Sequence, residues 1–287
     1  MLTLTVKQAL TQASSRLSTL SSPTLEARLL LSHVLNKPQT YPITNENEEL
    51  DAKKLSNFLA QVEKRKRRVP LAYLTQKKEF WGLDFYIDEH VFIPRSETEQ
   101  LVEESLQIIN DQMANAKSAA FSVADIGTGS GCIAISIAHG LLMPARKRAR
   151  LLKIPQSLAL GNRRLRCKIF ATDISSKALK IAKFNARQIL GPSHPITFLQ
   201  GDLLKPLPQK VDLIVANLPY LSEKEYQEAE PEIKFEPKEA IIGGVHGNEL
   251  IKKLLEQAPN YLKAGGKVIY ETVNGKILSW PQNAFAD

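Results

Sequence analysis

Hydrophobic side chains recur at helical spacing in the first part of the chain. Pro23 followed by Glu26 is typical of a helix start, and Asn36-Lys37-Pro38 is typical of a helix end. The polar stretch 41–49 predicts a loop. Residues 1–75 therefore predict a small helical bundle, because two sets of apolar residues follow the helical repeat: Leu25, Leu29, Leu30 and Val34, then Leu55, Phe58, Leu59 and Val62.

The pattern changes after residue 75. Aromatic and branched residues lie in near alternation over residues 79–93, which predicts a short β-hairpin in a linker at 76–94. Pro94 then precedes a cluster of acidic residues, and acidic side chains favour the first turns of a helix because they complement its dipole. A new helix is therefore expected to begin around this cluster, which consists of Glu97, Glu99, Glu103 and Glu104.

Strands and helices alternate from Val123 onward. Such alternation predicts a parallel sheet covered by helices on both faces, so residues 95–287 are expected to form one α/β domain of the Rossmann-like class. The expected strands are 122–127, 168–175, 196–202, 211–217 and 266–272, and the expected helices between them are 132–138 and 177–190.

The composition limits the possible cellular locations of the protein. The longest apolar runs, such as Ile133 to Ala138, are too short to span a bilayer, and no secretory signal is recognisable. Cys132 and Cys167 are far apart and have no metal-ligand spacing, so neither a disulfide framework nor a metal site is expected. These features favour a cytoplasmic protein. A mitochondrial location is the alternative, because the chain has no acidic residue before Glu26.

The net charge of +8 is concentrated in one segment. Residues 140–168 hold nine basic residues and no acidic one, and the remaining 29 basic residues face 30 acidic residues elsewhere. A second basic run, 64–68, either complements the dipole of the helix that it ends or contacts phosphate. The basic character therefore belongs to a segment of the protein and does not by itself predict a nucleic-acid substrate.

A glycine-rich loop lies between the first expected strand of the sheet and the helix that follows it. The sequence is Asp125-Ile126-Gly127-Thr128-Gly129-Ser130-Gly131, and glycines there let the backbone turn sharply and approach a ligand. The next strand ends in Asp173, whose carboxylate can accept hydrogen bonds from two ribose hydroxyls. The alternative is a simple glycine turn with an aspartate helix cap. The G-x-G-x-G spacing fits adenosylmethionine better than a dinucleotide, and Leu203 completes the expected cofactor residues.

The fourth expected strand of the sheet ends in Asn217-Leu218-Pro219-Tyr220, where doubly wound sheets bind ligands. An amide or exocyclic amine is a poor nucleophile because its lone pair is delocalised. The Asn217 side-chain oxygen and the Leu218 carbonyl can accept both N–H hydrogens, with Tyr220 packed on the flat group. This tetrapeptide predicts methylation of a planar nitrogen, although the same letters could form a plain strand-to-loop turn.

These motifs resemble the release-factor glutamine methyltransferase family (PrmC/HemK). The resemblance is most specific over residues 67–103, and DIGTGSG, ATDIS, VDLIVANLPY and EPKEAIIGGVHGNEL follow in the family's order. It implies a substrate-docking helical domain and a class I methyltransferase domain. It also implies methyl transfer from S-adenosyl-L-methionine to the glutamine N5 in the Gly-Gly-Gln motif of class 1 peptide chain release factors. Gly127 to Gly131 and Asp173 would hold the cofactor, Asn217 would touch both reactants, and the site would be walled by Phe92, Arg95 and Glu97 to Glu99.

The chain departs from the family in three places. Leu218 stands where the family usually has proline, and Asn-Leu-Pro-Tyr also resembles the motif of ribosomal RNA adenine dimethyltransferases. The basic segment 140–168 resembles an insertion, either solvated or in contact with RNA or a release factor, and its prolines and Gly161 argue against a single long helix. The chain also stops soon after Gly275, so we expect the C-terminal edge strands to be missing and stability or activity to be reduced.

Three functions remain open from the sequence. The leading one is a protein-glutamine methyltransferase that acts as a monomer. The alternative is an adenine-N6 methyltransferase of RNA or DNA, for which residues 140–168 would contact the nucleic acid. The third is a binding protein without catalysis.

Overall fold

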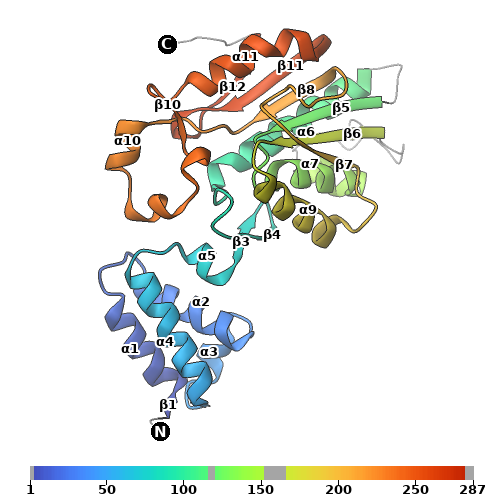
Figure 1. Ribbon diagram of the computed structural model, residues 1–287. Helices are drawn as coiled ribbons and strands as arrows, with labels where there is room; N and C mark the ends of the chain where they lie inside the picture. The colour runs from blue at the N-terminus through green and yellow to red at the C-terminus, as the bar shows by residue number, and fades with distance from the viewer. Residues whose placement is uncertain (1–2, 116–119, 152–165, 282–287) are drawn as a thin grey trace. The chain divides into compact units, whose positions relative to one another are not determined.

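The computed structural model of the chain describes residues 3–115, 120–151 and 166–281. The chain divides into two compact units (Figure 1). The N-terminal unit contains Met1–Lys77 and the later segment Glu230–Phe235, and the sheet unit contains Lys78–Ala229 and Glu236–Asp287. The expected boundaries at residues 75 and 94 stay predictions.

The N-terminal unit is built from helices, as the hydrophobic pattern predicted. A capping box starts its first helix, since the amide N of Gln8 donates to Thr5 Oγ1 at 3.3 Å and the amide N of Thr5 donates to Gln8 Oε1 at 2.9 Å. Asn36 ends the second helix in the left-handed conformation, at φ 51°. The elements are β1 (Leu4–Thr5), α1 (Val6–Arg16), α2 (Pro23–Leu35), α3 (Tyr41–Thr44), β2 (Glu49–Leu50), α4 (Ala52–Lys66), α5 (Leu71–Thr75) and η2 (Pro231–Phe235).

The expected loop at 41–49 is partly wrong. It contains α3, and its last residue begins β2, which pairs antiparallel with β1 through Leu4 and Leu50. Pro42 near the start of α3 is buried and suits the first turn of a helix, where its missing N–H is not needed. A four-residue helix and a two-residue strand are too short to leave a periodic pattern in the sequence.

A buried ion-pair cluster lies inside the N-terminal unit. The Arg65 guanidinium donates to Glu26 and, at 3.0 Å, to Glu232 Oε1, while Arg68 Nη1 lies 3.3 Å from the same Glu232 oxygen. The Arg65 side chain is only 8% exposed. Burial lowers the pKa of Arg65, but the hydrogen bonds and charges of the two glutamates outweigh it and raise the pKa overall. Within the basic run 64–68, Arg65 is thus paired with two glutamates inside the unit.

The sheet unit is a six-stranded sheet with the order β12-β11-β8-β5-β6-β7 (Figure 1). All neighbouring strands pair in parallel except β11 and β12, which are antiparallel. The strands are β5 (Ala120–Ile126), β6 (Arg166–Asp173), β7 (Ile196–Gln200), β8 (Val211–Ala216), β11 (Leu262–Glu271) and β12 (Ile277–Trp280). The five strands expected from the sequence are confirmed.

Helices cover both faces of this sheet (Figure 1). On one face α6 (Glu99–Asn115), α7 (Cys132–Leu142) and α9 (Ser176–Leu190) pack side by side. On the other face α11 (Glu249–Tyr261) places Ile251, Leu254 and Leu255 in one buried cluster with strand residues such as Ile126 and Ile214. This two-sided burial explains why the strands consist of nearly continuous apolar runs.

The expectation of missing edge strands is wrong in part. The tail after Gly275 folds back as β12 and pairs with β11, from Glu271 opposite Ile277 to Val268 opposite Trp280. The reversal is closed by a hydrogen bond from the amide N of Thr272 to the Lys276 carbonyl at 2.9 Å. Because β12 covers β11, the expected loss of stability cannot be attributed to an exposed β11 edge.

The expected hairpin is present as β3 (Lys77–Phe80) and β4 (Leu83–Tyr86). Trp81 and Gly82 both have positive φ, as a two-residue type I′ turn requires. The buried Asn185 of α9 holds β4 through two hydrogen bonds to the backbone of Tyr86, at 2.9 and 3.0 Å. The same side chain donates to the Ser130 carbonyl at 2.9 Å, so the hairpin is tied to the glycine-rich loop.

The basic segment is described only in part. Helix α7 ends at Leu142, Pro144 follows, and a separate helix α8 (Ala145–Leu151) begins, so the expectation that no single helix spans 140–168 is confirmed for the described part. Residues 152–165 lie outside the described residues. No described helix has both the length and the apolarity that crossing a membrane demands.

Candidate active site

The carboxyl ends of four parallel strands meet at one edge of the sheet. The register places Ile126 of β5 opposite Thr172 of β6 and Ala216 of β8, and Ala216 opposite Tyr270 of β11. The next residue along each strand or loop therefore reaches the same level. These residues are Gly127, Asp173, Asn217 and Glu271. Such an edge is where ligands bind in open α/β sheets.

The glycine-rich loop turns sharply between β5 and α7. Gly127, Gly129 and Gly131 all have positive φ, and the amide N atoms of Gly127 and Thr128 both donate to the Thr172 carbonyl at 2.9 Å. A Cβ added at Gly129 would meet no atom closer than 4.0 Å, so the loop faces open space there. The Ser130 hydroxyl is buried and has no hydrogen-bond partner among the described residues. The loop thus offers a ligand an uncovered stretch of backbone.

Asp125 is hydrogen-bonded to the glycine-rich loop. Its Oδ2 atom accepts a hydrogen bond from the Thr128 hydroxyl at 2.6 Å and another from the amide N of Ala134 at 3.1 Å. Complete burial raises the pKa of Asp125 to about 7, against the effect of these hydrogen bonds. Asp125 is therefore a positioning group for the loop.

We expect Asp125→Asn to remove a pH dependence of stability. Between pH 4 and pH 7 the folded protein keeps a proton on Asp125 that the unfolded chain has lost, so this group makes the wild type less stable as the pH rises. The asparagine variant should gain stability relative to the wild type across this window, on the order of 3 kcal/mol. Urea unfolding at pH 4.5 and pH 7.5 measures the difference, and an equal shift at both values would contradict the assignment.

Asp173 links the loop to the next helix. Its Oδ2 accepts from the amide N of Gly129 at 2.9 Å, and its Oδ1 accepts from the amide N of Ser175 at 2.8 Å. Each carboxylate oxygen can accept a further hydrogen bond, as ribose hydroxyls would need. The next residue, Ile174, is 68% exposed and offers an apolar surface beside the carboxylate. Sequence reasoning did not single out Ile174.

The backbone of Leu203 is hydrogen-bonded to β6 at the same edge of the sheet. Its carbonyl accepts a hydrogen bond from the Thr172 hydroxyl at 3.1 Å, and its φ is 50°. The side chain itself is buried in the core between the sheet and α11. The residues at this edge fit a nucleoside. The Asp173 carboxylate can accept hydrogen bonds from ribose hydroxyls, the backbone of the glycine-rich loop is uncovered at Gly129, and Ile174 offers an apolar side chain.

The tetrapeptide 217–220 begins where β8 ends. The Asn217 Nδ2 atom donates to Thr98 Oγ1 at 2.9 Å. In this arrangement the amide oxygen of Asn217 points away from Thr98. The Leu218 side chain is buried, and its Cδ2 atom fills the space 2.8 Å from where a Cβ on Gly127 would lie. Leu218 thus packs the tetrapeptide 217–220 against the glycine-rich loop.

A second glycine-rich loop supports Pro219 and Tyr220. This loop, residues 243–247, begins within β10 (Ile242–Gly244), which pairs in parallel with β9 (Leu221–Ser222). A Cβ on Gly243 would lie 2.3 Å from the Pro219 carbonyl oxygen, and a Cβ on Gly247 would lie 2.3 Å from the Tyr220 carbonyl oxygen. Only glycine allows this approach, because real Cβ atoms do not come so close to an oxygen.

We expect Gly247→Ala to disturb the tetrapeptide. Gly247 has φ 85°, so alanine there meets both backbone strain and the Tyr220 carbonyl. Gly265→Ala is a matched control, because Gly265 has φ 75° with no atom within 4 Å of its added Cβ. The control should lose about 1–2 kcal/mol of stability and keep its activity. The Gly247 variant should lose more stability and at least about tenfold in methyl transfer, since small displacements of catalytic groups are costly; equal behaviour of both variants would refute the contact.

Several charged side chains lie near Tyr220 of the tetrapeptide. Glu236, which is buried, accepts from the amide N of Ile93 at 2.9 Å and pairs with Arg95. The Arg95 guanidinium also lies 4.6 Å from the centre of the Phe92 ring. Burial raises the pKa of Glu236, which Arg95 opposes. Glu236 anchors the wall formed by residues 92–95, and sequence reasoning missed it although it lies inside the quoted stretch EPKEAIIGGVHGNEL.

Glu271 closes the site at the end of β11. Its side chain is 1% exposed, and its Oε2 atom has no hydrogen-bond partner in the part of the chain that the structure describes. Burial raises the pKa of Glu271, and the Thr98 side chain opposes this effect. Burial, followed by the charge of Glu271, also raises the pKa of Tyr220. The tetrapeptide therefore lies in a partly desolvated and acidic environment.

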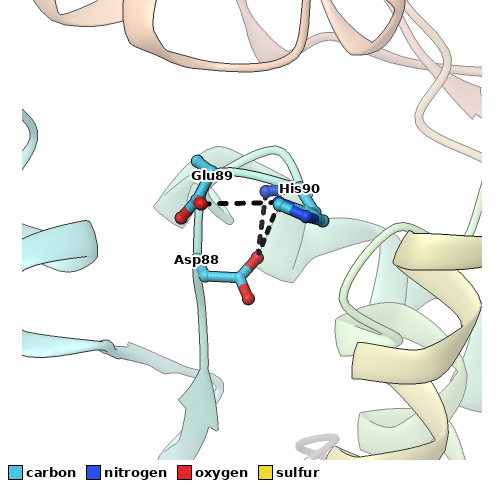
Figure 2. Close-up of side chains that lie close together, drawn as sticks. All are labelled: Asp88, Glu89 and His90. Atoms are coloured by element: carbon cyan, nitrogen blue, oxygen red, sulfur yellow. Dashed lines mark hydrogen bonds and ion pairs between the residues drawn. The ribbon is translucent and has the colours of Figure 1, made fainter.

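A cluster outside this edge is local in origin. Figure 2 shows Asp88, Glu89 and His90, whose ligand atoms lie within 4.8 Å of one another. The three residues are consecutive, and the amide N of His90 donates to Asp88 Oδ1 at 2.9 Å, as in an ordinary aspartate turn. This arrangement explains the proximity without an ion.

The chain shows clear similarity to known proteins. A model of the PrmC N-terminal domain matches residues 8–75, and a model described as a methyltransferase domain matches residues 117–285. A release factor glutamine methyltransferase from Bacillus anthracis is 32% identical over 270 residues, which make up 93% of this chain and 85% of that protein. The chain belongs to the release factor glutamine methyltransferase family.

Two further relatives are similar over the same share of the chain. A release factor glutamine methyltransferase from Moorella thermoacetica is 34% identical over 271 residues, covering 93% of this chain and 85% of that protein. A bifunctional methyltransferase from Rickettsia conorii is 33% identical and covers 93% of this chain but 50% of that protein. The expected α/β methyltransferase fold and the family resemblance are confirmed.

Proposed function

We propose that this protein transfers a methyl group from S-adenosyl-L-methionine to the glutamine side-chain amide nitrogen of peptide chain release factors. The observation that carries the proposal is the environment of Asn217. Its NH2 group is held by Thr98, so its amide oxygen is available to a substrate at the edge where the glycine-rich loop and Asp173 lie. Membership of the release factor glutamine methyltransferase family supports the choice of substrate.

The cofactor residues are proposed from the fit described above. S-adenosyl-L-methionine, when bound, supplies a methyl group on a sulfonium that is ready for transfer to a nucleophile. Asp173 would accept hydrogen bonds from the ribose, and Ile174 would cover the base. The proposed contacts of the glycine-rich loop are Gly127, Thr128, Gly129, Ser130 and Gly131, with Leu203 behind them.

The substrate nitrogen needs activation because its lone pair is shared with the amide carbonyl. The Asn217 oxygen and the Leu218 carbonyl would accept its two N–H hydrogens and increase the electron density on nitrogen. Pro219 and Tyr220 would hold this geometry, because Gly243 and Gly247 approach their carbonyls closely. The nitrogen would gain the methyl carbon as the carbon–sulfur bond breaks, and the electron pair of that bond would stay with the sulfur as a neutral thioether. The nitrogen would then release one proton to water. Positioning of the reactants then provides most of the rate.

The experiment uses the full chain, labelled S-adenosyl-L-methionine and a purified class 1 release factor, with the label located by mass spectrometry. We expect one added methyl group on the glutamine of the Gly-Gly-Gln motif. A release factor in which that glutamine is replaced by asparagine is the matched control and should stay unlabelled. Label on any other residue, or no label with active cofactor binding, would reject the proposal.

An adenine-N6 methyltransferase is the second candidate. It is favoured by the Asn-Leu-Pro-Tyr sequence and by the exposed Arg146, Lys147 and Arg150 of α8. The same assay with ribosomal RNA in place of the release factor tests it, and labelling of RNA should then fall steeply with added salt. We favour the release factor, with the protein acting as a cytoplasmic monomer.

A further inference from the structure

The orientation of the Asn217 amide depends on the position of the Thr98 hydroxyl. The Asn217 Nδ2 atom donates to Thr98 Oγ1 at 2.9 Å, and Thr98 is 1% exposed. A hydrogen bond weakens steeply when its distance and angle depart from their best values. A small movement of Thr98 would therefore release the amide, which would be free to turn and present NH2 instead of oxygen to a substrate nitrogen.

Thr98 is the last residue of a short 3-10 helix, η1 (Ser96–Thr98). Its amide N donates to the Arg95 carbonyl at 3.2 Å. The hydrogen bonds of a 3-10 helix have poorer geometry than those of an α-helix, and this one has only three residues. The position of Thr98 therefore depends on what holds the residues beside it.

Contacts with other segments of the sheet unit hold both sides of η1. Arg95, just before η1, pairs with Glu236. Glu99, just after η1, accepts a hydrogen bond at its Oε1 atom from the amide N of Trp81 at 2.8 Å. The residue that directly precedes Thr98 is Glu97, and it is held by a third segment.

The turn between β11 and β12 packs against Glu97. A Cβ added at Gly275 would lie 2.7 Å from the Glu97 Cβ atom, a distance that real Cβ atoms do not reach. The turn is closed by its own hydrogen bonds. The amide N of Gly275 donates to the Thr272 carbonyl at 3.1 Å, and the Thr272 hydroxyl donates to the Lys276 carbonyl at 3.0 Å. The backbone at Gly275 therefore lies directly on the first carbon of the Glu97 side chain.

We propose that the turn 272–276 is a positioning element of the active site, which holds Glu97 and thereby keeps Thr98 where it orients the Asn217 amide. The proposal rests on the proposed function for its catalytic consequence. The contact is at the Glu97 Cβ atom, which is bonded to the backbone of η1, so a displacement there moves the 3-10 helix itself. Gly275 acts only through Glu97 and Thr98, and it needs no contact with the substrate.

The first test places a side chain in this contact. Gly275→Ala should lower kcat about 10- to 100-fold with little change in the affinity for S-adenosyl-L-methionine, because a small displacement of a catalytic group is costly. Gly265→Ala is the matched control. Gly265 has φ 75° and Gly275 has φ 69°, but an added Cβ at Gly265 meets no atom within 4 Å. The control should keep the wild-type kcat, and equal values of kcat in both variants would refute the proposal.

A second variant separates the contact from backbone strain. Asparagine adopts the left-handed conformation more readily than alanine, so Gly275→Asn should lose less stability while it keeps the added Cβ. We expect a loss of kcat similar to that of Gly275→Ala and a higher melting temperature. This variant also serves as the test if Gly275→Ala does not fold. A kcat that recovers together with the melting temperature would mean that the turn only stabilises the fold.

A double-mutant cycle tests the path through Thr98. Thr98→Val removes the hydroxyl and nearly keeps the shape of the side chain. In this background Gly275→Ala should lower kcat by no more than about twofold, because the hydrogen bond to Asn217 is already lost. The same fold loss in both backgrounds would overturn the role of Thr98 as the link.

The last measurement does not depend on activity. The side-chain NH2 signals of Asn217 can be identified in a nitrogen-15 NMR spectrum by their absence in Asn217→Asp. In Gly275→Ala they should shift and exchange faster with solvent hydrogen than in the wild type and in Gly265→Ala. Identical signals in all three proteins refute the proposal even if methyl transfer to a release factor is found. A wild type that transfers no methyl group to a release factor refutes the proposed function alone.

Discussion

Asn217→Ala is expected to reduce methyl transfer to a release factor about 100- to 1,000-fold, the usual loss when one preorganised polar group of an active site is removed. The variant lacks the oxygen that accepts a substrate N–H hydrogen. It also leaves the buried Thr98 hydroxyl without its 2.9 Å partner. Single-turnover rates at saturating release factor measure the effect on the chemical step separately from binding.

The control for this variant is another asparagine with a comparable hydrogen bond. Asn45 Nδ2 donates to the Tyr41 carbonyl at 3.0 Å in the N-terminal unit, remote in sequence from the tetrapeptide 217–220. Asn45→Ala should leave the single-turnover rate within about twofold of the wild type, since substitutions away from such special features have small effects. Calorimetry should show that Asn217→Ala still binds S-adenosyl-L-methionine. An unchanged rate in Asn217→Ala would refute the role of its amide oxygen.

Arg65→Met is expected to destabilise the N-terminal unit by about 3–5 kcal/mol, because it leaves buried carboxylates without their cation. Methionine retains the apolar stem of arginine, so the loss reports mainly on the charge. The side chains of Glu26 and Glu232 are 13% and 20% exposed, so water can replace the guanidinium only in part. Hydrogen exchange of peptides from α2 and α4, read by mass spectrometry, measures the local opening free energy.

Arg16→Met provides the comparison. Arg16 also pairs with one carboxylate, Glu63, at 2.9 Å, but these side chains are 35% and 45% exposed. An exposed pair contributes less than about 1 kcal/mol, so this variant should exchange almost as slowly as the wild type. Similar losses in both arginine variants would mean that burial of the Arg65 cluster is not what stabilises the unit.

Local patterns in the sequence were sufficient for most of the fold. The strands β5, β6, β8 and β11 each contain buried apolar residues, such as 268–270 in β11, and the helix ends carry recognisable capping residues. The strand β12 was missed because its four residues, ILSW, carry no pattern of their own. It forms because the turn at 272–276 brings it back onto β11, which supplies the backbone partners.

The candidate site divides in the same way. The glycine-rich loop, Asp173 and the tetrapeptide 217–220 can each be recognised from a short stretch of sequence. Each lies at the carboxyl end of an expected parallel strand, which predicts that they meet at one edge of the sheet. The hydrogen bond between Asn217 and Thr98 joins residues that are 119 positions apart in the sequence, so no local pattern could contain it. Arg65 was likewise hidden in a basic run, because its burial depends on a glutamate 167 residues away.

The membership of Glu230–Phe235 in the N-terminal unit bears on any attempt to divide the protein. The polypeptide enters this unit twice, so no single cut separates a complete helical unit from a complete sheet unit. A fragment that ends at residue 77 would lack Glu232 and leave Arg65 with only part of its ion-pair network. A fragment that begins at residue 78 would carry Glu232 without its arginines. A study of the helical unit on its own therefore requires residues 230–235 to be grafted onto the first fragment.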